Sequence, residues 1–219
     1  MPSISPISAE LALPPAAELR PEFAREAFVI GHGALSSERA RELREKALDL
    51  VGRHARRIDQ RSEEHILRYR VVTGDAICAE WPELFALYES PALRAWVAAV
   101  VGADAVFNSC HLRSAININA LGEPGEVYRW HFDVAGFTLL LYLTDSRDED
   151  GGALELRPRD EVTTLLPTAG TVVLMDGTRC LHRASPILRR HQRISIPMVF
   201  TPQPDHDRPA GLDDYLYRG

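Results

Sequence analysis

The spacing of apolar residues changes from a helical period to an alternating one midway along the chain. The clearest helix is predicted to begin at Ser36 or Ser37, either of which suits its N-cap. Another, capped by Ser90 and ended by Gly102, is predicted further along the chain. The core-facing positions are Ala40, Leu43, Ala47, Leu50 and Val51 in the first helix and Leu93, Trp96, Val97, Val100 and Val101 in the second. The N-terminal part is therefore predicted to be mainly helical, with a short strand at 28–30.

Beyond residue 106 the apolar positions alternate, and turn signals separate short segments. Strands are predicted at 112–119, 137–144, 153–157, 162–166, 170–175 and 192–200. In the first of these, Asn117 and Asn119 share a face with Arg113 and Ala115, and that face either meets water or lines a polar cavity. Short strands at close spacing predict an antiparallel sandwich or barrel, with the N-terminal helices packed on one sheet.

Two stretches lack such a pattern. Residues 1–22 contain five prolines, which predicts an irregular arm. Residues 53–70 carry charges of both signs with little periodicity, so we interpret them as a solvated loop or helix surface. The alternative is a mobile segment from which an arginine side chain binds an anionic substrate. The tail after Pro202 is expected to cover part of a cavity mouth.

Length and composition indicate one globular domain over 1–219, with helical support in 1–105, a β core in 106–202 and a tail in 203–219. The net charge of −6 gives no basic surface typical of nucleic-acid binding, and no run of about 18 apolar residues predicts a membrane span. The N-terminus lacks the features of a signal peptide. The three cysteines form no paired motif, so we expect a cytoplasmic protein with reduced thiols.

The candidate chemistry lies in His131, Asp133 and His182. His131 and Asp133 are two residues apart, so on a strand or at its end they point to the same side. A third imidazole from a distant strand, that of His182, would complete two nitrogens and one carboxylate around a metal. This is the ligand set of non-haem Fe(II) oxygenases, which leaves coordination positions open. His-X-Asp alone is a weak signal, and Arg193, eleven residues after His182, strengthens it.

Together these residues resemble the 2-oxoglutarate-dependent Fe(II) dioxygenase superfamily. Its pattern is His-X-Asp, a variable stretch, a second His and then Arg, often within Arg-X-Ser. The resemblance extends to Gly125–Tyr128, Leu141–Thr144, Gly151-Gly152, Pro158, Pro167 and Gly170–Leu174, and spans roughly residues 107–202. Within the superfamily, the chain is similar to prolyl-hydroxylase-like and phytanoyl-hydroxylase-like small-molecule hydroxylases.

The resemblance implies an α+β fold: a double-stranded β-helix (jelly-roll, cupin-like) core backed by N-terminal helices. It also implies Fe(II) held by His131, Asp133 and His182, with 2-oxoglutarate and O₂ as co-substrates. Arg193 is expected to hold the distal carboxylate of 2-oxoglutarate, and Ser195 to donate a hydroxyl to it. Further polar residues are candidates for the cavity wall: Asn117, Asn119, Tyr128, Thr138 and Tyr142.

The implied activity is hydroxylation of a small metabolite, with a free amino acid or a derivative as the favoured substrate. Halogenases of the superfamily replace the carboxylate ligand with Gly or Ala, so the presence of Asp133 favours hydroxylation. Nucleic-acid demethylases carry a second Arg six residues after the first, where this chain has Val199. The alternatives are a peptidyl or carrier-bound substrate, or, from another class, a non-catalytic jelly-roll binding protein or a zinc hydrolase. We expect a monomer or homodimer.

Overall fold

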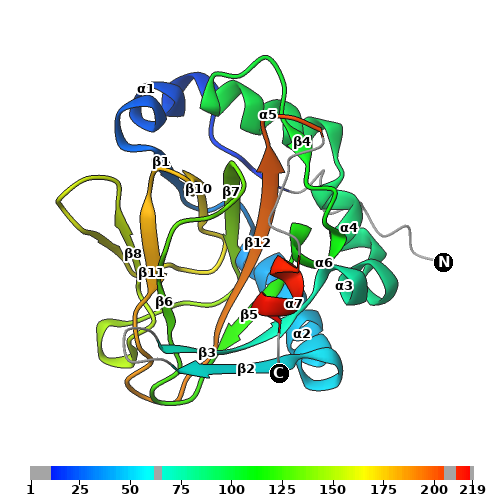
Figure 1. Cartoon of the computed structure of the whole chain (residues 1–219), viewed down its shortest axis with the longest axis vertical. Coiled ribbons are helices and arrows are strands. Elements are labelled where there is room, and N and C mark those ends of the chain that lie inside the picture. The colour runs from blue at the N-terminus through cyan, green and yellow to red at the C-terminus, as the bar shows by residue number, and fades with distance from the viewer. Residues whose placement is uncertain (1–10, 62–65, 205–210, 218–219) are drawn as a thin grey trace.

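Two antiparallel sheets face each other, and helices cover the outer side of the larger one (Figure 1). The computed structural model describes residues 11–61, 66–204 and 211–217. The major sheet has the strand order β1 (Phe28–Gly31), β10 (Val172–Asp176), β7 (Phe137–Tyr142), β12 (Arg193–Thr201), β5 (Ile118–Leu121), β3 (Ile66–Val72) and β2 (Arg56–Arg61), and β4 (Phe107–Asn108) pairs with β12. The minor sheet has the order β6 (Tyr128–His131), β11 (Leu181–Ala184), β8 (Leu154–Arg157) and β9 (Thr163–Leu165). This is the antiparallel sandwich that the strand pattern predicts, with the jelly-roll form that the resemblance implies.

Two of the helices, α2 and α5, begin at the predicted caps. The helices are α1 (Ala16–Glu26), α2 (Ser37–His54), α3 (Gly74–Glu80), α4 (Pro82–Tyr88), α5 (Pro91–Val101), α6 (Leu112–Ala115) and α7 (Leu212–Leu216), with a 3₁₀ turn at Asp148–Asp150. The Ser36 hydroxyl accepts the backbone N–H of Arg39, and the Ser90 hydroxyl accepts that of Leu93. Helix α5 ends at Gly102, whose φ of 77° is the left-handed conformation that glycine adopts without a steric penalty.

The alternation of side chains on β7 and β12 divides the interior into two layers. Leu139 and Leu141 on β7, with Ile196 on β12, pack against the helices in the largest apolar cluster. Leu140 and Tyr142 project to the opposite side and pack between the two sheets. Because successive strand residues point to opposite faces, the register that buries the apolar residues also fixes which polar residues face the minor sheet.

Three segments differ from the sequence-based prediction. The predicted strand 112–119 is the short helix α6 followed by β5. The turn forms because the Asn117 amide donates to the carbonyls of Arg113 and Ile116, which competes with strand pairing. The predicted loop or helix surface within 53–70 instead contains the hairpin β2–β3, and β3 pairs with β5. Helix α1 begins at Ala16, within the arm 1–22 that was predicted to be irregular, and extends to Glu26, with Phe23 buried.

One described stretch, Pro82–Val101, is long and apolar enough to span a membrane by length and composition. In the structure it is two helices, α4 and α5, interrupted at Ser90-Pro91. Leu84, Leu87 and Val97 are at most 1% exposed and belong to the largest apolar cluster. One face of this stretch therefore packs into the protein core, and 39% of the stretch is buried.

Candidate metal and co-substrate site

The inner face of the major sheet forms one wall of a cavity of about 150 Å³. Ser195 on β12 lies directly opposite Tyr142 on β7 and Asn119 on β5, so the three side chains project in one row. Arg193 and Pro197 lie two residues to either side of Ser195 and face the same cavity. The strand alternation predicted for β12 thus places its polar residues between the sheets.

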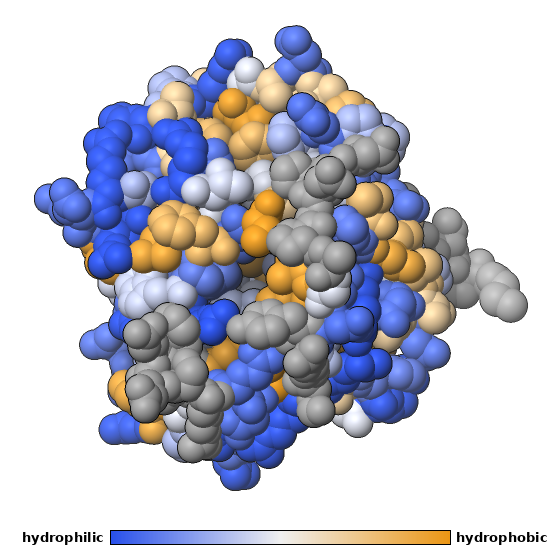
Figure 2. Space-filling view, in the orientation of Figure 1, coloured by the Kyte–Doolittle hydropathy of each residue, from blue (hydrophilic) through white to orange (hydrophobic). Residues whose placement is uncertain are grey.

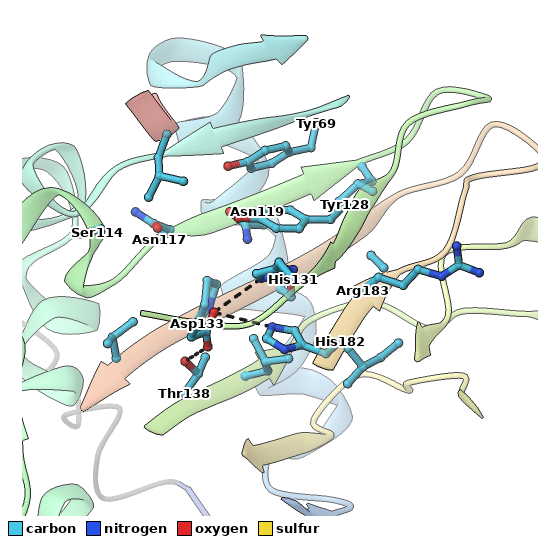
Figure 3. A pocket seen from close by; sticks show the side chains of 18 of the residues that line it. Tyr69, Ser114, Asn117, Asn119, Tyr128, His131, Asp133, Thr138, His182 and Arg183 are labelled. Carbon is cyan, nitrogen blue, oxygen red and sulfur yellow. Dashed lines mark hydrogen bonds and ion pairs between the residues drawn. The ribbon is translucent and has the colours of Figure 1, made fainter. Parts of the chain in front are cut away.

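Three potential metal ligands converge across the cavity (Figure 3). His131 ends β6, His182 lies on β11, and Asp133 lies in the segment between β6 and β7. The two histidines are directly paired across the minor sheet, and their ring centroids are 4.1 Å apart. Nε2 of His131 and Nε2 of His182 lie 3.5 Å and 3.7 Å from Oδ1 of Asp133. One ligand atom from each residue lies within 4.8 Å of the others, which suits a single ion held by all three.

A β-bulge on β6 brings Tyr128 to the same cavity as His131. His182 pairs with His131 and Ala184 with Tyr128, so three steps along β6 match two along β11. Without the extra residue, Tyr128 and His131 would point to opposite faces of the sheet. Instead their rings lie 4.7 Å apart.

Backbone carbonyls orient both imidazoles. Nδ1 of His131 lies 2.9 Å from the Arg129 carbonyl, and Nδ1 of His182 lies 3.0 Å from the Cys180 carbonyl. A carbonyl oxygen only accepts hydrogen bonds, so Nδ1 carries the proton in each ring. The Nε2 lone pairs are left for a metal, and the ring orientation is fixed by the partner on the other nitrogen.

The protonation states also suit metal ligands. Burial, together with the neighbouring His131, lowers the pKa of His182 to about 4 despite the opposing effect of Asp133. Burial alone would raise the pKa of Asp133, but the His182 and His131 imidazoles and the Thr138 hydroxyl hold it well below its ordinary value. At neutral pH His182 is therefore neutral and Asp133 ionised, which are the forms that bind metals.

Arg193 is a buried cation, only 3% exposed. Its Nε donates to the Gly152 carbonyl at 2.6 Å, and its Nη2 donates to the Tyr142 hydroxyl at 3.2 Å. Nη1 lies 3.5 Å from the Ser195 hydroxyl. In the part of the chain that the structure describes, no carboxylate pairs with this guanidinium. A buried charge without a counter-ion is costly, so the pocket is suited to an anion.

All ten residues that the sequence nominates line this one cavity: His131, Asp133, His182, Arg193, Ser195, Asn117, Asn119, Tyr128, Thr138 and Tyr142. Two of the wall candidates contact other site residues. Thr138 donates to Oδ2 of Asp133 at 2.6 Å, and Tyr142 contacts Arg193. The Oδ1 atom of Asn119 is buried without a hydrogen-bond partner.

Several cavity residues were not predicted individually. Tyr69 on β3, Ser114 on α6, Arg183 on β11, and Leu216 and Tyr217 at the end of α7 also line the wall. The Tyr217 hydroxyl donates to Oδ1 of Asn117 at 2.9 Å, so the tail does reach the cavity as expected. Tyr69 contacts the Tyr128 ring with centroids 4.8 Å apart. No sequence signal identified Tyr69, because the hairpin that contains it was predicted as a loop or helix surface.

Apolar side chains flank the Asp133 carboxylate on the surface. Phe132 and Val134, on either side of Asp133, are 54% and 48% exposed, and Val134 lines the cavity. Figure 2 shows hydrophilic residues over most of the face seen there and a group of hydrophobic residues near its centre. The cavity therefore combines polar site residues with apolar wall residues such as Leu140 and Leu154, and Val134 adds an exposed apolar side chain to its lining.

Comparison with known proteins identifies both family and fold. The sequence matches the family model described as Halogenase D over residues 14–164. No curated protein matches it. The structure is similar to a 2OG-Fe(II) oxygenase family oxidoreductase from Burkholderia pseudomallei, with 14% identity, a TM-score of 0.69, and coverage of 92% of this chain and 97% of that one.

Two further solved structures are similar. One is the epimerase SnoN in complex with Fe³⁺, alpha ketoglutarate and nogalamycin RO (15% identity, TM-score 0.67, 85% of this chain and 83% of that one). The other is a prolyl-4-hydroxylase from Pseudomonas putida (17% identity, TM-score 0.60, 85% and 98%). At these identities the likeness establishes the fold, which confirms the predicted jelly roll. With the family match, it confirms the resemblance to the 2-oxoglutarate-dependent dioxygenase superfamily.

Proposed function

Because this chain belongs to the Halogenase D family, we propose that it is an Fe(II)- and 2-oxoglutarate-dependent dioxygenase. The proposed reaction is hydroxylation of an unactivated C–H bond of a small metabolite, with release of succinate and CO₂. The observation that carries this proposal is a pair of features in one cavity. Two imidazoles and a carboxylate converge there, and a buried guanidinium lies without a described carboxylate partner.

The donor set fits Fe(II). His131, Asp133 and His182 supply two nitrogens and one oxygen, and a facial set of this kind with open positions is typical of non-haem Fe(II) oxygenases. The carbonyl partners of both Nδ1 atoms give the fixed orientation that metal-ligating histidines require. The same three residues would also bind Zn²⁺, so the ligand set alone does not decide the metal.

The environment of Arg193 fits a dicarboxylate. Its planar guanidinium offers donors that match the two oxygens of a carboxylate. Ser195 and Tyr142 add hydroxyl groups next to it. Burial raises the pKa of Tyr142 in spite of Arg193, so the phenol remains a donor at neutral pH. A zinc hydrolase or a simple binding protein has no evident use for this arrangement.

Iron, 2-oxoglutarate and O₂ would together supply the oxidising chemistry when bound. The chain itself has three tasks. His131, Asp133 and His182 hold the metal, and Arg193 fixes the far end of the co-substrate. The apolar side chains of Leu140 and Leu154 line the space beside these groups and limit the access of water.

Asp133 favours hydroxylation over halogen transfer, although the family model carries the name of a halogenase. A halogenase of this superfamily lacks the carboxylate ligand, and a halide takes the vacated position. Here the carboxylate is present, ionised and directed at both imidazoles. The position that a halide would need is therefore filled by the protein.

A free amino acid or a derivative is the favoured substrate, because the cavity is small and its far wall is polar. Asn117, Asn119, Tyr69 and Tyr217 supply amide and phenol groups there. A peptidyl or carrier-bound substrate is the second candidate. The exposed apolar side chain of Val134, which lines the cavity, favours it, since a larger substrate would contact that surface.

The test is anaerobic reconstitution with Fe(II) followed by 2-oxoglutarate, with detection of the weak visible metal-to-ligand charge-transfer band. The band is expected in the wild type and absent in His182→Ala and Arg193→Ala. Arg190→Ala serves as the matched control, because Arg190 is exposed and pairs with Glu123. Amino acids and peptides are then screened for a shift of the band and for faster succinate release. No band, with zinc or no metal bound, would refute the oxygenase assignment.

A further inference from the structure

We propose that Thr138 is a positioning residue that restricts Asp133 to binding the metal through one oxygen, which keeps a coordination position open for the co-substrate. This inference rests on the proposed Fe(II)/2-oxoglutarate function and adds a specific role to it. The sequence nominates Thr138 only as a wall residue. The structure shows its hydroxyl committed to a metal ligand instead.

The two oxygens of Asp133 have different surroundings. Oδ1 faces Nε2 of both histidines, at 3.5 Å and 3.7 Å. Oδ2 accepts the Thr138 hydroxyl at 2.6 Å. A short hydrogen bond between a hydroxyl and a carboxylate is about twice as strong as one between neutral groups. Thr138 therefore holds Oδ2 away from the side on which the imidazoles converge.

Gly177 restricts the carboxylate from a second direction. Its carbonyl accepts the backbone N–H of Asp133 at 2.8 Å. A methyl group at Gly177 would overlap both the Asp133 carboxylate and its Cβ, so only glycine leaves room for the observed rotamer. Gly177 belongs to the turn between β10 and β11, whose Cys180 carbonyl orients His182. One turn thus positions two of the three metal ligands.

The consequence follows from counting coordination positions. An octahedral metal has six positions; the protein triad uses three, and three stay open for co-substrate and O₂. A 2-oxo acid that chelates through two atoms and one O₂ molecule fill those three. Carboxylates also bind metals through both oxygens, as they do in many Ca²⁺ sites. If Oδ2 of Asp133 turned onto the metal, it would compete directly with the chelate.

The test measures metal affinity and 2-oxoglutarate affinity separately, without turnover. Thr138→Val removes the hydroxyl at nearly constant volume, and Thr138→Ser retains it. Thr163→Val is the matched control, because Thr163 is exposed on β9, away from the cavity lining. Each variant is loaded anaerobically with Fe(II), the metal affinity is determined, and 2-oxoglutarate is titrated while the visible band is followed.

Thr138→Val is expected to bind 2-oxoglutarate about tenfold more weakly, with a shifted band. This magnitude is the lower end of the effect that the loss of such a partner has on metal affinity or activity, about 10–100-fold. Thr138→Ser and Thr163→Val are expected to behave as the wild type. Equal 2-oxoglutarate affinity and an unchanged band in Thr138→Val would refute the role of Thr138 while leaving the oxygenase assignment intact. No band in the wild type would refute the oxygenase assignment itself.

Gly177→Ala gives an independent measurement. The added methyl group is expected to displace the Asp133 carboxylate, so the Fe(II) affinity itself should fall by about tenfold or more. Unchanged metal binding in a folded Gly177→Ala protein would show that the carboxylate is not confined, and that result would also overturn the proposal.

Discussion

Replacing Arg193 by methionine separates a role in co-substrate binding from a structural role. The first role predicts a loss of affinity for 2-oxoglutarate, and the second predicts a loss of stability with the affinity unchanged. A hydrogen bond to a charged group contributes about 1.5–3 kcal/mol. Two such bonds from one guanidinium to one carboxylate therefore contribute at least about 3 kcal/mol. Since 1.4 kcal/mol corresponds to a factor of ten, the affinity for 2-oxoglutarate should fall on the order of 100-fold.

The stability of the protein without ligands should fall only modestly in the same variant, because two opposing effects partly cancel. Methionine loses the donors to the Gly152 carbonyl and the Tyr142 hydroxyl, and because the donor is charged each lost bond costs about 1.5–3 kcal/mol. It also removes a buried cation, and replacing buried charges by well-packed apolar groups is often neutral or stabilising by about 1–4 kcal/mol. The two effects oppose each other, so the free energy of unfolding should fall by no more than about 2 kcal/mol.

The assay is urea unfolding of the metal-free protein, together with calorimetric titration of 2-oxoglutarate into the Fe(II)-loaded protein under anaerobic conditions. Arg190→Met is the matched control, because that side chain is 79% exposed. A wild-type affinity for 2-oxoglutarate in Arg193→Met, accompanied by a loss of more than about 2 kcal/mol of stability, would refute the reasoning. Arg193 would then be a structural residue whose charge the fold itself stabilises.

Three further outcomes are expected. Asp133→Ala and His182→Ala should each abolish tight Fe(II) binding in equilibrium dialysis; retention of tight binding by either would remove that residue from the ligand set. The metal-free protein should lose stability as the pH falls from about 6.5 to about 4, because the unfolded chain protonates His182 at a higher pH than the folded chain does. His182→Gln should flatten that slope in urea unfolding, and an unchanged slope would assign it to other groups. Tyr217→Phe removes a hydrogen bond to Asn117 of about 1 kcal/mol, so the KM for the substrate should rise roughly fivefold in steady-state assays while the 2-oxoglutarate affinity stays constant.

The strands of the β core, and the common direction of His131 and Asp133, were predictable from short-range periodicity. The jelly roll, the inclusion of His182 and the role of Arg193 came instead from the resemblance to the superfamily, because His182 lies 49 residues after Asp133. Alternation along 192–200 placed Arg193 and Ser195 on one face, and that face lines the cavity. The spacing of His131 and Asp133 placed both on one side of the chain. In both cases the prediction depends on residues only a few positions apart, because residues two apart on a strand point to the same face.

Features that depend on pairing between distant segments were not predictable. The bulge that brings Tyr128 beside His131 arises from a mismatch between β6 and β11. Helix α6 replaces a predicted strand because the Asn117 side chain bonds the carbonyls before it. Tyr69 comes from a hairpin without apolar periodicity, and its place in the cavity is set by the pairing of β3 with β5. No pattern of neighbouring residues in the sequence indicates these contacts.

The site joins the two sheets, and this explains why its parts are spread along the sequence. His131 and His182 belong to the minor sheet, and Arg193 belongs to the major sheet. Asp133 lies in the segment that leads from one sheet to the other, where Thr138 and Gly177 fix its carboxylate. A co-substrate bound at once to the metal and to Arg193 would link the sheets non-covalently. Binding only to the folded state stabilises that state by mass action, so metal and 2-oxoglutarate together should protect the protein against unfolding more than the metal alone.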